Sequence, residues 1–114
     1  MNLQENIRRI LREENINFTM IMRRVPHNDL EREFNESLDM SSNMLRNINE
    51  RDGNIMSLKR FIDVTISILI DGIHYELHST MPDDVQWYND AIESLKDHYK
   101  DRIKTRYREL MSEI

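Results

Sequence analysis

Apolar residues recur every three or four positions along most of this 114-residue chain, and no stretch of useful length alternates with a period of two. The first spacing is typical of α-helices that turn one face toward a core, whereas half-buried strands alternate. Glycine and proline are scarce, so Pro26, Asp52-Gly53 and Pro82 mark the breaks. The sequence therefore predicts an all-α protein, with helices over residues 3–13, 29–51, 57–79 and 82–114.

The stretch 58–77, LKRFIDVTISILIDGIHYEL, is apolar nearly all round its predicted helix. A helix of this kind belongs at the centre of a bundle. We expect its large apolar side chains to be enclosed by neighbouring helices: Phe61, Ile66, Leu69 and Ile73. The simplest arrangement is a bundle of three long antiparallel helices, with the short N-terminal amphipathic helix beside it.

The junction before this bundle carries local signals. Asn28 is expected to cap the second helix with its side chain. Residues 15–25 are expected to be a linker with room for one helical turn, because Val25 precedes a proline and is pushed out of the helical conformation. We therefore expect residues 1–25 to form an N-terminal arm and linker, and residues 26–114 to form the helical bundle.

Charge and composition restrict the partners. The chain carries a net charge of −5; residues 1–24 hold five arginines and three glutamates, about +2, which leaves about −7 on the rest. An acidic body does not attract phosphate backbones, so nucleic acid is not an expected partner. Asp63 and Asp71 interrupt the longest apolar run, which argues against a membrane span. The N-terminal residues lack the apolar core of a secretory leader, so we do not expect secretion.

The predicted helix over residues 57–79 also carries a polar stripe. Its members are Arg60, Asp63, Ser67, Asp71, His74 and His78. Asp71, His74 and His78 fall on consecutive turns, a spacing that can hold a divalent transition metal. A helical di-iron site would need a matching carboxylate-x-x-His on another helix, and Leu95 stands three residues before His98 instead. We therefore favour a solvent-facing edge, with a metal-binding helical enzyme as the last alternative.

Motifs for nucleophilic catalysis are missing from the sequence. It has no cysteine, no GxSxG and no glycine-rich phosphate loop, and two glycines cannot readily build a backbone cradle for phosphate. We expect neither enzymatic activity nor a cofactor. The apolar faces of the first and last helices are then the expected contact surface, through Leu3, Ile7, Leu11, Ile103, Tyr107 and Leu110. Exposed apolar stripes of this length usually mark an interface, so a homodimer is a candidate assembly; no other protein partner can be named.

Residues 4–14, QENIRRILREE, resemble the short leader of many small proteins of large contractile-tailed phages, and residues 56–88 resemble uncharacterised small phage proteins. The resemblance implies an amphipathic helix that directs the chain into the capsid. It also implies cleavage by a prohead protease after Glu13, since Leu11-Arg12-Glu13 fits the cleavage pattern; Ile48-Asn49-Glu50 fits the same pattern.

On this basis we expect a small non-enzymatic phage accessory protein that acts through helical protein–protein contacts. Its expected location is the host cytoplasm or the virion interior. A cytoplasmic regulatory protein that binds a host or phage factor is the alternative. For residues 3–13, a fourth helix of the bundle is the alternative to a targeting leader.

Overall fold

The computed structural model describes residues 18–78 and 85–114, and these form four α-helices without a strand among them. The helices are α2 (Phe18–Arg24), α3 (His27–Asp52), α4 (Leu58–His78) and α5 (Val85–Glu113). The prediction of an all-α protein is confirmed. The helix expected over residues 3–13 and the helix start expected at Pro82 lie outside the described residues.

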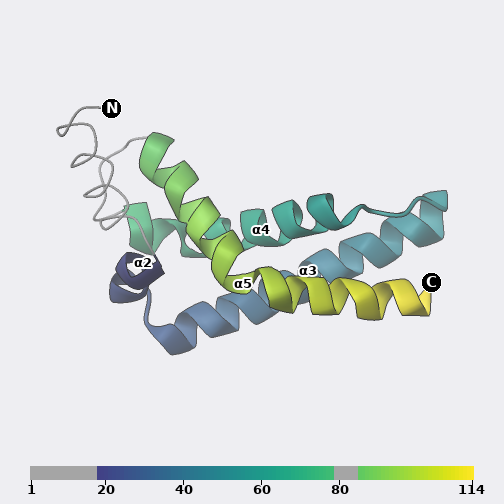
Figure 1. Cartoon of the computed structure of the whole chain (residues 1–114), viewed down its shortest axis with the longest axis horizontal. Coiled ribbons are helices and arrows are strands. Elements are labelled where there is room, and N and C mark those ends of the chain that lie inside the picture. Colours follow the sequence, from purple (N-terminus) through teal and green to yellow (C-terminus); the bar gives the residue numbers. More distant parts are fainter. Residues whose placement is uncertain (1–17, 79–84) are drawn as a thin grey trace, which may run out of the picture.

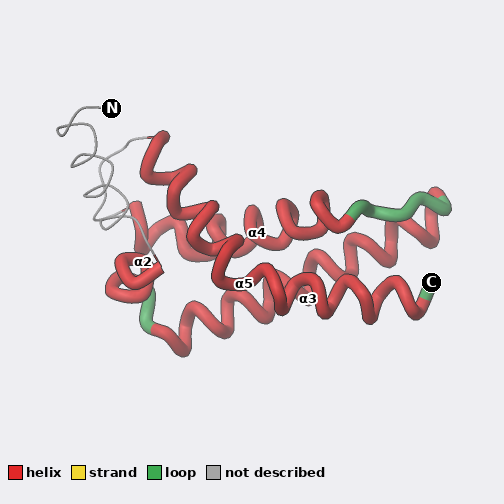
Figure 2. Tube along the Cα trace, viewed as in Figure 1, coloured by secondary structure: helices red, strands yellow, loops and turns green. Residues whose placement is uncertain are grey.

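The three long helices pack lengthwise, and α4 runs in the opposite direction to α3 and α5 (Figure 1 and Figure 2). Helix α5 changes direction about half way along, and its second half lies along α3 (Figure 1). Short helix α2 lies at the end of the molecule where α3 begins, against α5 and α4. One face of α4 is thereby left uncovered by α5.

The ends of α3 are set by a proline and a glycine. The helix begins at His27 with Pro26 at the N-cap position and without a side-chain capping bond, so the prediction that Asn28 caps it is wrong. Proline suits this place because its missing N–H would have no partner in the first turn. The helix ends at Gly53, which has a left-handed φ of 69° and donates its N–H to the Asn49 carbonyl at 2.8 Å. The predicted turn at Asp52-Gly53 is confirmed.

The segment expected to be a linker contributes to the core. Helix α2 spans Phe18–Arg24, and Ile21 and Val25 are only 0% and 2% exposed. Val25 follows the helix, as its proline neighbour predicted. Seven residues are too few for a helix that is stable alone in water, so burial against α4 and α5 stabilises α2. The packed core therefore extends N-terminal to the boundary expected at residue 25.

The core draws on every described helix, and α4 and α5 each contribute five of its buried apolar side chains. The enclosure predicted for α4 is confirmed, since Phe61, Ile66, Leu69 and Ile73 are each at most 1% exposed. Where α3 meets α4, small hydroxyl residues are buried, and Thr65 donates its hydroxyl to the Ser41 hydroxyl at 2.7 Å. Small side chains let two helices approach closely. None of the helices within the described ranges is long and apolar enough to cross a membrane.

Candidate interaction surface

The contact residues predicted on α5 lie in the core or at its edge. Ile103 and Leu110 are 0% and 1% exposed, so the prediction that they form an exposed contact surface is wrong. Tyr107 is half-buried: its hydroxyl donates to the Met56 carbonyl at 2.7 Å, and its ring packs against Phe61. The physical reason is that the apolar stripe of α5 is covered by α3 and α4. The remaining predicted residues, Leu3, Ile7 and Leu11, and the candidate cleavage residue Glu13 lie outside the described residues.

The candidate metal ligands lie on the surface of α4. Asp71 and His74 are exposed, and the side chain of His78 is outside what the structure describes. Among the described side chains, no three acidic or histidine residues gather closely enough to hold a metal ion. Asp63 of the same stripe forms an ion pair with Lys96 of α5 at 2.9 Å. The hydrogen bond that Lys96 donates to Asp63 raises the pKa of Lys96. Of the described members of the stripe, Arg60, Ser67, Asp71 and His74 are exposed.

Exposed apolar side chains gather where α3 and α4 face away from α5. Met40 and Met44 lie one turn apart on α3 and are 54% and 43% exposed. Beside Met44 an open hollow follows α4 from Lys59 to Asp71, and none of its lining residues comes from α5. We call this the α3–α4 outer face, with members Met40, Met44, Arg60, Val64, Ser67, Ile68 and Asp71.

Charge on the α3–α4 outer face is segregated along α4. Lys59 and Arg60 are exposed at the start of the helix, and Asp71 is exposed about three turns later. None of the ion pairs within the described part of the chain involves these three residues. Between the two charged ends lie Val64, Ser67 and Ile68, together with Asp63, whose charge is paired with Lys96 of α5. The unpaired charges of the face are thus basic at one end and acidic at the other, with two apolar side chains and a serine between them.

From the sequence, Met40 and Met44 were assigned no role. The signal that could have found them is their spacing of four residues, which puts two large apolar side chains on one exposed strip of a helix. That spacing alone does not tell whether a neighbour covers the strip. The packing of α5 on the other side of the α3–α4 pair leaves it open.

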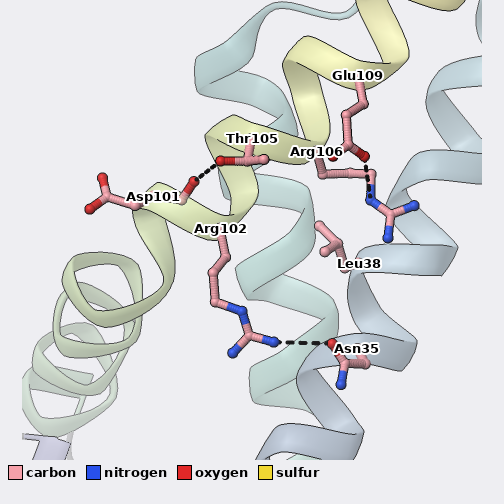
Figure 3. A pocket seen from close by; sticks show the side chains of 7 residues that line it. All are labelled: Asn35, Leu38, Asp101, Arg102, Thr105, Arg106 and Glu109. Carbon is pink, nitrogen blue, oxygen red and sulfur yellow. Dashed lines mark hydrogen bonds and ion pairs between the residues drawn. The ribbon is translucent and has the colours of Figure 1, made fainter.

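A polar cluster joins α3 to α5 elsewhere in the molecule. Arg102 donates from Nη1 to Glu31 Oε2 at 2.7 Å. It also donates from Nη2 to Asn35 Oδ1 at 3.2 Å (Figure 3). Its guanidinium lies 4.5 Å from the centre of the Phe34 ring, and Tyr99 donates its hydroxyl to Glu31 Oε1 at 3.3 Å. These contacts occupy Arg102 within the chain, so the cluster acts to hold α5 on α3.

The titration of this cluster agrees with a structural role. Burial on its own would raise the pKa of Glu31, but the hydrogen bond and charge of Arg102, with the Tyr99 hydroxyl, lower it below its usual value. Burial and the negative charge of Glu31 raise the pKa of Tyr99. Glu31 is therefore ionised and Tyr99 neutral at neutral pH, far from the protonation change that acid–base catalysis requires.

An open groove beside this cluster runs between α3 and α5 (Figure 3). Thr105 donates its hydroxyl to the Asp101 carbonyl at 3.0 Å, and Arg106 lies 3.8 Å from Glu109 and 3.9 Å from Asp39. Both arginines that line the groove already face carboxylates. The groove is therefore poorly suited to an anionic ligand, and the α3–α4 outer face is the stronger candidate site.

Comparison of the chain with protein-family models, with curated proteins and with solved structures finds no match. Function has to be inferred from the residues and their arrangement.

Proposed function

We propose that this protein is a small non-enzymatic phage accessory protein that binds another protein through the α3–α4 outer face. The observation that carries the proposal is the exposed pair Met40 and Met44 on α3, of which Met44 lines the hollow along α4. Methionine side chains are flexible and polarizable, so they adapt to a partner surface. Apolar side chains that gather on the surface of a small protein mark an interaction site.

A non-enzymatic role is supported by the way the interhelical carboxylates are used. Glu31 is held by Arg102 and Asp63 by Lys96, and each pair joins two helices. A catalytic acid or base works best when its pKa lies near the ambient pH, whereas Arg102 contributes to lowering that of Glu31 away from it. The charges of these carboxylates therefore serve packing.

The phage part of the proposal is supported by the resemblance of residues 4–14 and 56–88. It includes the narrower proposal that residues 3–13 direct the chain into the capsid and are removed after Glu13. The intact mass of the protein in purified particles tests this, and we expect a chain that starts at Glu14. A full-length chain in the particles, or particles without the protein, would contradict the targeting role.

The binding role can be tested by photo-crosslinking in infected cells. A photoreactive residue placed at Met44 is expected to yield a covalent adduct with another protein chain, because this side chain is exposed and lines the hollow of the proposed surface. The matched control is the same residue at Arg108, which is exposed on α5 and does not line the hollow. If position 44 yields no adduct, or no more than position 108, the proposal is wrong.

A further inference from the structure

We propose that the α3–α4 outer face binds a second copy of this chain, with α4 of one copy antiparallel to α4 of the other about a two-fold axis. The inference rests on the proposed function, since it names the partner of the same face. It comes from the order of charged and apolar side chains along α4.

Four residues of α4 that reach the surface fall on one narrow stripe. Arg60, Val64, Ser67 and Asp71 are separated by four, three and four residues, which is the spacing of helix positions that face a partner helix. Arg60, Ser67 and Asp71 are exposed and Val64 is half-buried. Asp71 lies eleven positions after Arg60, which is about three turns, so the two charged side chains point in nearly the same direction.

This stripe is complementary to itself when it is reversed. In a two-fold interface, each contact between one residue and another occurs twice with the roles exchanged. Two antiparallel stripes centred between residues 65 and 66 place Arg60 of each copy opposite Asp71 of the other, and Val64 opposite Ser67. A parallel pairing would instead place Arg60 on Arg60 and Asp71 on Asp71. Charge complementarity therefore selects the antiparallel arrangement.

The side chains beside this stripe suit a close but modest contact. Ser67 is small, so the two copies of α4 can approach each other at the centre. Ile68 and Met44 line the same hollow and would be covered by the second copy. Because few apolar side chains contribute, we expect reversible association that depends on protein concentration and on ionic strength.

Sedimentation velocity of the full-length protein over a series of concentrations at low salt tests the inference. The wild-type chain is expected to dimerise. Arg60→Asp and Asp71→Arg are each expected to raise the dissociation constant roughly tenfold, because each replaces two attractive contacts by two repulsive ones. An equimolar mixture of the two variants is expected to recover wild-type association, because opposite charges then meet at both ends.

Controls separate charge effects from folding. Arg108→Asp and Asp97→Arg make the same charge changes on exposed positions of α5, and neither they nor their mixture should alter association. The double variant Arg60→Asp/Asp71→Arg exchanges the positive and negative charges of the stripe and should dimerise like the wild type. Its recovery, with unchanged helical circular dichroism, excludes misfolding as the cause of the single-variant loss.

A wild-type protein that stays monomeric at every concentration would overturn the inference, as would a mixture that fails to recover. The crosslinking experiment distinguishes this failure from failure of the proposed function. An adduct from position 44 to a different protein means that the face binds a partner but not a second copy. An adduct composed of two copies of this chain supports the inference.

Discussion

The ring of Tyr99 in α5 stacks on the ring of Phe34 in α3, with their centres 3.9 Å apart and their planes 10° from parallel. Both side chains are fully buried. Aromatic pairs of this kind contribute about 0.5–1.5 kcal/mol beyond the area they bury. Since the second half of α5 lies along α3, this stack and the Arg102 cluster beside it set where the two helices meet.

Phe34→Ala should lower the free energy of unfolding by about 3–5 kcal/mol, because it leaves a cavity and removes the partner of Tyr99. Urea denaturation followed by circular dichroism measures the change. Tyr99→Phe is the matched comparison, since it keeps the ring and removes only the hydroxyl that donates to Glu31. Its cost should be at most about 1 kcal/mol. Equal losses in the two variants would show that the stack is not what holds the helices.

His98 should make stability depend on pH. Its ring stacks on Phe18, with centres 3.6 Å apart, and meets Tyr99 edge-on. Burial lowers the pKa of His98; Arg102 and His27 act in the same direction, and Glu31 opposes them. The folded state therefore favours the neutral ring. This contribution to stability is complete above the unfolded pKa of about 6.5, falls as the pH drops from there to the folded pKa, and is constant below it.

Urea denaturation between pH 8 and pH 5 measures this effect, which should be small because the His98 side chain keeps contact with solvent. His98→Gln should flatten the dependence in this range. An equal pH dependence in the wild type and in His98→Gln would contradict the assignment.

Removing the Ser41 and Thr65 hydroxyls together should cost less stability than enlarging the Ser41 side chain. Thr65 donates to Ser41, which in turn donates to the Leu38 carbonyl at 3.0 Å. The double variant Ser41→Ala/Thr65→Val removes both polar groups together, so its effect on unfolding should stay within about 1 kcal/mol. Ser41→Leu should cost about 1–3 kcal/mol, because the helices have no room for it. Thermal unfolding compares the stabilities of the two variants. A Ser41→Leu variant as stable as the wild type would disprove the close approach of α3 and α4.

Gly72→Ala should be neutral or stabilise the protein by up to about 1 kcal/mol, since alanine favours a helix over glycine by that amount. A Cβ at this position would lie 2.5 Å from Glu33 Oε2, but that atom ends a flexible side chain that can turn away. Gly53→Ala is the control: its φ of 69° is unfavourable for alanine, so it should destabilise. If Gly72→Ala also lowers the melting temperature, Glu33 cannot move and the glycine sets the helix spacing.

Sequence reasoning located the long helices because their apolar stripes are local patterns. Leu30 and Phe34 of α3 are buried, as are the large apolar side chains predicted at the centre of α4. The cap of α3 was misplaced by two residues because Asn28 offers a good capping side chain, whereas the helix already begins after Pro26. Helix α2 was read as a linker because a seven-residue helix has little local preference and depends on its neighbours.

On the candidate surface, too, local sequence predicts an apolar face but not whether another helix covers it. Ile103 and Leu110 carry the spacing of an apolar face, and nothing local to α5 reveals that α3 and α4 cover it. Met40 and Met44 carry a similar spacing and stay exposed. The spacing of apolar residues within a helix defines its apolar face, so the sequence alone determined the all-α class and the central place of α4. Which faces are covered depends on contacts between residues far apart in the chain, and only the tertiary structure decided that.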